Sequence, residues 1–140
     1  MTIEQISQLS DSHVEQLHAL YQNEWWTEGR ELADVRRMLE NTDVALGLIE
    51  LQTDRLVAFC RVLTDFTYHA TLYDVIVAPS HRDQQLGRQL MDALVTDPRL
   101  DSVGAIWLCC LPDMVPFYRK WGFSEAIDDL KWMRRVPGER

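Results

Sequence analysis

Three strand-like runs follow one another between residues 44 and 77 with no helical pattern between them, and this order restricts the fold most strongly. Val44 to Ile49 and Leu56 to Leu63 are apolar runs separated by Thr53-Asp54, a pair typical of a hairpin turn. The third run, Ala70 to Val77, leads into Pro79, and proline cannot donate a hydrogen bond to a neighbouring strand. We therefore expect strands of one sheet, the third of which ends before this proline.

Helical patterns precede and follow these strands. Ser10-Asp11 suits the N-terminal cap of a helix whose apolar residues recur at three- and four-residue spacing. A second helix is expected between Gly29 and Asn41, a third from Leu86 to Val95, and a fourth from Pro112 to Lys120. Apolar residues on one face of a helix predict that it packs against a core.

Further strands complete the expected order. Residues 1–7 alternate weakly, the run from 105 to 110 is short and apolar throughout, as in strands buried on both faces, and residues 123–136 are expected to form one or two closing strands. Cys109 and Cys110 are interpreted as inert packing in the buried strand. The order β-α-α-β-β-β-α-β-α-β predicts a single domain over residues 1–140 of the α/β class, a mixed β-sheet flanked by helices.

Composition narrows the expected partners and compartment. The chain has 14 Lys and Arg against 22 Asp and Glu, a net charge of −8, and phosphate-backbone binding normally needs a basic face, so we expect no nucleic-acid partner. No apolar run approaches the roughly 20 residues of a membrane span, so we expect no membrane partner. Three cysteines, two of them adjacent, predict neither a disulfide framework nor a metal site. With no signal-peptide pattern, the chain is expected to be cytoplasmic.

The segment from residue 75 to residue 88 combines the end of a strand, a polar turn and the first turn of a helix. The first N–H groups of a helix have no partners within it, and the helix dipole adds partial positive charge there, so a phosphate group fits such a turn. Gly87 would let an anion approach the backbone closely, whereas His81 is expected on the loop surface. The turn by itself is a weak signal, because every strand-turn-helix leaves the same donors free.

A second segment makes the pattern specific. Residues 82–87 read Arg-Asp-Gln-Gln-Leu-Gly and residues 117–123 read Phe-Tyr-Arg-Lys-Trp-Gly-Phe. Together they resemble the pyrophosphate loop and the later Phe-Tyr-x-x-x-Gly-Phe signature of the GCN5-related N-acetyltransferase (GNAT) family. One position departs from the family pattern, because Gln85 stands where the first loop glycine is usual. If φ must be positive there, a residue other than glycine costs on the order of 1 kcal/mol.

The resemblance implies transfer of an acetyl group from acetyl-CoA to a primary amine of a small molecule, by direct transfer in a ternary complex. In this family the main chain of the strand before the loop pairs with the pantetheine arm, and the loop holds the pyrophosphate. The matching positions in this chain are Val75, Ile76, Val77, Arg82, Asp83, Gln84, Gln85, Leu86, Gly87 and Arg88.

The resemblance also assigns catalytic and acceptor residues. Tyr118 matches the tyrosine that protonates the departing thiolate, and Asp74 is the expected general base, with His69 as a rival because its pKa lies near neutrality. Trp25, Trp26 and Tyr21 fall in the segment that helps to wall the acceptor pocket.

Several alternatives stay open at this stage. The chain could be a catalytically silent CoA-binding or ligand-sensing module, and an acyl-enzyme on Cys109 or Cys110 is the enzymatic alternative. The acceptor is not defined, although the acidic composition and the tryptophan pair favour a small cationic or aromatic amine. A homodimer through residues 127–136 is a further option that the resemblance suggests.

Overall fold

In the computed structural model, which describes residues 2–138, the chain forms two compact units, the first ending at Cys109 and the second beginning at Cys110. The first unit holds β1 (Ile3–Ile6), α1 (Asp11–Tyr21), α2 (Leu32–Glu40), β2 (Val44–Glu50), β3 (Arg55–Thr64), β4 (His69–Val77), η1 (Pro79–His81), α3 (Leu86–Val95), η2 (Pro98–Leu100) and β5 (Ala105–Trp107). The second unit holds η3 (Pro112–Met114) and α4 (Val115–Arg119).

The five strands form one sheet in the order β1-β2-β3-β4-β5. The first four strands pair antiparallel with their neighbours, and β5 pairs parallel to β4. The expected series of three strands is confirmed, as is the turn at Thr53-Asp54, where Asp54 has a φ of 56°. The mixed sheet with helices beside it confirms the α/β class.

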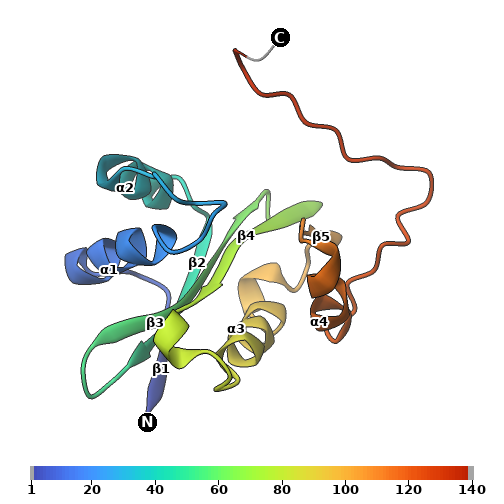
Figure 1. The fold of residues 1–140 in the computed structure, drawn as a ribbon. Helices are drawn as coiled ribbons and strands as arrows, with labels where there is room; N and C mark the ends of the chain where they lie inside the picture. Colours follow the sequence, from blue (N-terminus) through green and yellow to red (C-terminus); the bar gives the residue numbers. More distant parts are fainter. Residues whose placement is uncertain (1, 139–140) are drawn as a thin grey trace. The chain divides into compact units, whose positions relative to one another are not determined.

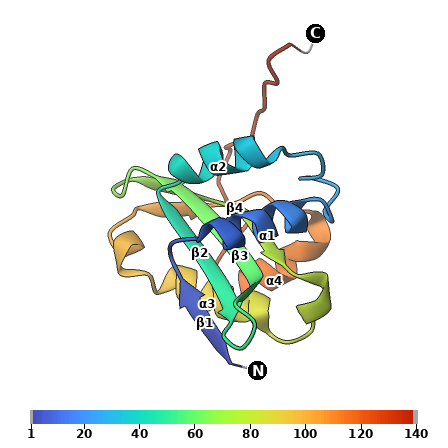
Figure 2. The ribbon, with the colours of Figure 1, turned by 90° about the vertical axis from the view of Figure 1, so that its left-hand side faces the viewer.

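Helices cover both faces of this sheet. Figure 1 shows α1 and α2 on one face and α3 on the other, and Figure 2 views the first of these faces, with both helices in front of the strands. Burial of one large aliphatic or aromatic side chain stabilises a fold by about 1.5–3 kcal/mol. The core under α1 and α2 is made of Val14, Leu17, Leu20, Tyr21, Val35, Ile49, Leu56, Phe59, Ile76 and Ala78. The buried side chains of α3 are Leu86, Leu90, Met91 and Leu94.

The start of α1 confirms the expected cap and adds a long-range contact. The Ser10 hydroxyl accepts a hydrogen bond from the His13 N–H (3.2 Å), and His13 Nδ1 accepts one from the Ser10 N–H (3.4 Å). His13 Nε2 lies 3.0 Å from Asp54 Oδ1, in the turn between β2 and β3. This buried imidazole therefore fixes the first turn of α1 against the hairpin.

Two expectations about the C-terminal third are wrong. The strand expected from 105 to 110 ends at Trp107, and Cys109 and Cys110 are exposed rather than buried. Among the described residues no strand follows α4, so the one or two closing strands expected over residues 123–136 are not formed. Leu130, at 60% exposure, belongs to an alternating apolar pattern that supplies strand propensity, but a strand also needs a neighbour to pair with.

Aromatic side chains organise the second unit. Phe117 packs edge-on against Tyr118 and Trp121, with ring centroids 5.0 and 4.8 Å apart, and Tyr118 packs edge-on against Phe123 at 6.2 Å. Gly122, which follows the short helix, has a φ of 87°, a conformation that suits glycine. The Phe-Tyr…Gly-Phe segment thus forms a helical turn closed by a glycine. No helix among residues 2–138 is long and apolar enough to span a membrane.

Candidate active site

The second half of β4 has a free edge. In the part of the chain that the structure describes, β5 pairs with β4 only through His69, Ala70 and Thr71, opposite Ala105–Trp107. Residues 72, 73, 76 and 77 therefore pair with β3 on one side, and none of residues 72–77 pairs with a described strand on the other. Successive N–H groups of a strand alternate in direction, so this edge offers backbone donors and acceptors to an extended ligand.

The same half of β4 contains a bulge. Phe59 pairs with Ile76 and Arg61 with Tyr73, so β4 carries one more residue than β3 between these pairs. Asp74 lies in this interval with a φ of 58°, a left-handed conformation that asparagine and aspartate adopt more readily than other non-glycine residues. Bulges occur often beside active sites, where they redirect a side chain. Here the redirected side chain is the carboxylate of Asp74.

That carboxylate is held by three donors. Asp74 Oδ2 accepts hydrogen bonds from the Tyr21 hydroxyl (3.0 Å), Arg30 Nη1 (2.8 Å) and Arg61 Nε (2.7 Å). The donors come from α1, the α1–α2 loop and β3, so one buried side chain joins three segments to β4. The loop that contains Arg30 is itself held by hydrogen bonds. The Gln22 side chain accepts a hydrogen bond from the Gly29 N–H (3.0 Å) and donates one to the Arg30 carbonyl (3.1 Å).

The charge state of Asp74 bears on its expected role as a general base. Burial alone would raise the pKa of the Asp74 carboxyl, but the hydrogen bonds and positive charges of Arg30 and Arg61 outweigh burial and hold this pKa below its usual value. Burial and the neighbouring carboxylate raise the pKa of Tyr21 above its usual range. A carboxylate with a lowered pKa and three donors is a weak proton acceptor, so the structure favours a positioning role for Asp74.

Arg30 and Arg61 were not expected at this site from the sequence. Neither belongs to a local motif, and their contacts with Asp74 join positions 44 and 13 residues apart. One signal was available, because Arg61 interrupts the apolar run of β3, and a charged residue in a buried strand requires a partner.

The loop before α3 contains two residues in the left-handed region of backbone conformation. Gln85, the N-cap residue of α3, has a φ of 62°, and Asp83 has a φ of 64°. The Gln85 side chain makes no capping hydrogen bond, so it does not occupy the first N–H groups of the helix. Asp83 is exposed, which keeps its charge in solvent.

The start of the loop is fixed by an unexpected contact. His81 is buried rather than on the loop surface, and its Nε2 lies 3.0 Å from Glu50 Oε2 at the end of β2. Ser80 Oγ lies 2.7 Å from His81 Nδ1. The hydrogen bond to His81 and a second one from Thr53 lower the pKa of Glu50. The imidazole thus anchors the turn that precedes Arg82.

Arg82, the first loop residue of the family pattern, pairs with an acidic residue of the α1–α2 loop. Arg82 Nη2 donates to Glu24 Oε1 at 2.6 Å. Half of the Arg82 side chain is exposed, so this ion pair contributes little to stability. Arg82 can therefore leave Glu24 and bind another anion. The contact brings the proposed pyrophosphate loop and the proposed acceptor segment together.

The expected acceptor residues divide into two groups. Trp25 and Trp26 are exposed, at 73% and 39%, and their rings are accessible on the α1–α2 loop. Tyr21 is fully buried, with its hydroxyl on Asp74, so its ring offers no surface to an acceptor in this conformation.

His69, the rival general base, is exposed. Its Nδ1 accepts a hydrogen bond from Trp107 Nε1 at 3.1 Å, which occupies one ring nitrogen.

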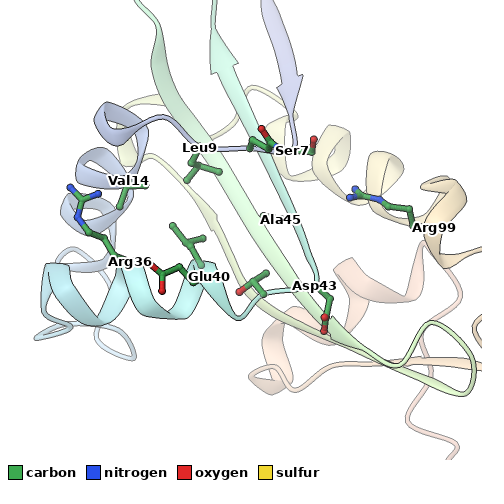
Figure 3. A pocket seen from close by; sticks show the side chains of 11 residues that line it. Ser7, Leu9, Val14, Arg36, Glu40, Asp43, Ala45 and Arg99 are labelled. Carbon is green, nitrogen blue, oxygen red and sulfur yellow. The ribbon is translucent and has the colours of Figure 1, made fainter.

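A separate groove of about 570 Å³ lies between the segment before α1, the helix α2 and the start of β2 (Figure 3). Leu9, Arg36, Glu40 and Ala45 line it, and none of the site residues expected from the sequence does. Among residues 2–138, no group of three or more His, Cys, Asp or Glu side chains is arranged to hold a metal ion.

Comparison with known proteins agrees with this fold. The acetyltransferase (GNAT) family model matches residues 6–123, so the chain belongs to this family, and the expected N-acetyltransferase class is confirmed. An uncharacterized N-acetyltransferase, ycf52, from Porphyra purpurea is 30% identical over 134 residues, covering 94% of this chain and 76% of that protein.

Two further relatives are informative. Serotonin N-acetyltransferase 2, chloroplastic, from Oryza sativa subsp. japonica is 36% identical over 106 residues, which cover 74% of this chain and 53% of that protein. A crystal structure of a GNAT-family protein from Xanthomonas campestris pv. campestris has a TM-score of 0.81 and 28% identity, covering 99% of this chain and 96% of that one. The chain therefore has the architecture of a GNAT enzyme over nearly its whole length.

The left-handed conformation of Gln85 leads to a prediction about stability. Gln85→Gly removes backbone strain of about 1 kcal/mol and, because Gln85 is exposed, loses little packing. Glycine also gives the unfolded chain more conformational entropy, which lowers stability by a similar amount. We expect urea denaturation to show stability within about 0.5 kcal/mol of the parent. Gln89→Gly, at an exposed position inside α3, is expected to cost about 1 kcal/mol. Equal losses for the two variants would contradict the strain at residue 85.

Proposed function

We propose that this chain transfers an acetyl group from acetyl-CoA to a primary amine of a small molecule by direct attack in a ternary complex. The observation that carries the proposal is the half of β4 that has β3 on one edge and, among the described residues, no strand on the other; it leads through a short turn into the N-terminus of α3. An extended pantetheine chain needs the first feature, and a pyrophosphate needs the second.

The residues present fit the donor. Val75 to Val77 would pair through their main chain with the pantetheine arm. The N–H groups of Leu86, Gly87 and Arg88, at the first turn of α3, would bind the pyrophosphate. Arg82 would add a positive charge after leaving Glu24.

The reaction forms a bond between the amine nitrogen and the acetyl carbonyl carbon and breaks the bond from that carbon to sulfur. The amine loses one proton, and the departing thiolate gains one. The main chain of Val75 to Val77 supplies N–H donors for the carbonyl oxygen, whose charge grows during attack. Tyr118 of the second unit is the proposed proton donor to the thiolate.

The amine must lose a proton during the reaction, and a group must accept it. An alkyl amine with a pKa near 10 is only about 0.1% neutral at pH 7. Since Asp74 is engaged by Tyr21 and two arginines, and His69 Nδ1 by Trp107, we propose that water carries this proton to solvent. Asp74 then acts by holding the bulge of β4 and the α1–α2 loop in place.

The exposed tryptophans and one relative support a proposal for the acceptor class. One relative is named for serotonin, and Trp25 offers a flat surface on which an aromatic amine can stack. We propose a small primary amine with a planar or apolar body.

A free-thiol assay tests this function. Purified protein is mixed with acetyl-CoA and a panel of aliphatic, aromatic and sugar amines, and CoA release is followed with a thiol reagent. Amine-dependent release supports the enzyme, whereas acetyl-CoA binding without release for every amine supports the silent module. Mass spectrometry after incubation with acetyl-CoA alone tests the acyl-enzyme, because an acetyl group on Cys109 or Cys110 would contradict direct transfer.

A further inference from the structure

The carboxylate in the bulge of β4 neutralises only half of the positive charge around it. Arg30 Nη1 and Arg61 Nε both donate to Asp74 Oδ2, and Arg30 Nη2 lies 3.4 Å from Oδ1. Among the described residues, neither arginine forms an ion pair with any other carboxylate. Two guanidinium groups on one carboxylate leave a formal surplus of one positive charge. The local surplus is positive, whereas the net charge of the whole chain is −8.

The side chains of the two arginines are mostly buried but keep some contact with solvent. The exposed fraction of the side chain is 12% for Arg61, 31% for Arg30 and 4% for Asp74. Arg61 lies over the Tyr73 ring at 4.9 Å and Arg30 over the Tyr21 ring at 4.6 Å. Charges in such a position are screened less by salt than charges on an open surface.

Donors of the cluster also remain available. Within the described residues, Arg61 uses only Nε for a hydrogen bond, so its two Nη groups make none. Among the described residues, no side-chain nitrogen or oxygen is both completely buried and without a hydrogen-bond partner, so each Nη group of Arg61 keeps some exposed surface. A guanidinium with both Nη groups free matches the two oxygens of a carboxylate or of a phosphate.

We propose that Arg61 and Arg30 bind an anionic oxygen group, carboxylate or phosphate, carried by the acceptor amine. The inference rests on the proposed function, because it takes Val75 to Val77 as the segment that holds the thioester. Asp74 immediately precedes this segment, so an anion bound at the arginines is placed beside the reacting centre. A polyamine would meet like charge there, so this assignment departs from the cationic acceptor that the composition favours.

Matched amines that differ only in the anionic group test the proposal. Tryptophan is compared with tryptamine, 5-hydroxytryptophan with serotonin, and glucosamine 6-phosphate with glucosamine. We expect kcat/KM to be about 10-fold or more higher for the anionic member of at least one pair, because hydrogen bonds between charged groups are stronger than those between neutral groups. The first two pairs report a carboxylate and the third a phosphate. No preference in any pair, or faster turnover of the amines without the anion, would overturn the proposal.

Variants locate the preference in the cluster. Arg61→Gln is expected to remove most of the preference, and Arg61→Lys is expected to keep part of it because the charge remains. Arg55→Gln, at an exposed arginine of the same strand, is the matched control and is expected to leave the preference unchanged. A preference that survives in a folded Arg61→Gln protein would overturn the assignment.

A binding measurement separates this inference from the proposed function. If no amine is acetylated, the proposed function fails, and calorimetry with N-acetyltryptophan and N-acetyltryptamine still tests the arginine cluster. Tighter binding of N-acetyltryptophan in the parent, lost in Arg61→Gln, supports the anion site. Equal binding of the two compounds overturns it.

Discussion

Replacing Asp74 with asparagine is expected to lower the free energy of unfolding by about 3 kcal/mol or more, which corresponds to a fall in Tm of roughly 10 °C. Asparagine tolerates the left-handed backbone of the bulge and keeps the size of the side chain, so the change isolates the charge. Arg30 and Arg61 would then lie largely buried with no counter-charge. Urea and thermal denaturation of the two proteins measure the difference.

The stability difference between the parent and Asp74→Asn is expected to change with pH in one direction. The pKa of Asp74 is lower in the folded chain than the value of about 3.9 for an unfolded aspartate. Its contribution to stability is therefore complete at neutral pH and is lost as pH falls below about 4, through the lowered folded pKa. Asp101→Asn, at an exposed aspartate, is the control and should change little. An Asp74→Asn protein with unchanged stability and abolished turnover would instead identify Asp74 as the general base.

Replacing Tyr118 with phenylalanine is expected to reduce kcat by about 10²- to 10⁴-fold, the range for loss of a general acid. The Tyr118 ring packs against Phe117 and Phe123, and the substitution keeps this packing, so stability should fall by less than the loss of a core side chain would cause. Stopped-flow or steady-state thiol release measures kcat, and calorimetry shows whether the Kd for acetyl-CoA is unchanged.

Tyr68→Phe serves as the matched control for the tyrosine prediction. Tyr68 is 69% exposed in the β3–β4 loop and is expected to tolerate the change with full activity. If Tyr118→Phe also retained full kcat, Tyr118 would be a packing residue of the second unit, and the thiolate would take its proton from solvent or from another group.

The parts of the structure that local patterns specify could be predicted from the sequence. Ser10 caps α1 because its hydroxyl satisfies a free N–H, and Pro79 ends β4 because proline cannot extend a ladder. Residues 82–87 and 117–123 carried the family resemblance because a strand-turn-helix loop and the helical turn of the second unit are both formed by short contiguous segments.

Features that depend on long-range contacts could not be predicted in this way. The bulge at Asp74 and the arginines bound to it are determined by pairing between β3 and β4 and by the fold of the α1–α2 loop. Asp74 was expected to be the general base because it is the only carboxylate of its strand, but whether it accepts a proton depends on its long-range partners, which the sequence does not show. One or two closing strands were expected over residues 123–136 from their apolar positions, and such positions do not supply a pairing neighbour.

Calorimetric titration of the purified protein with acetyl-CoA, and separately with dephospho-CoA, tests the donor site most directly. We expect acetyl-CoA to bind with micromolar affinity, and dephospho-CoA to bind with a similar Kd, because the proposed contacts are to the pantetheine and the pyrophosphate. No binding of acetyl-CoA up to millimolar concentration would contradict a donor site at the free edge of β4 and the first turn of α3.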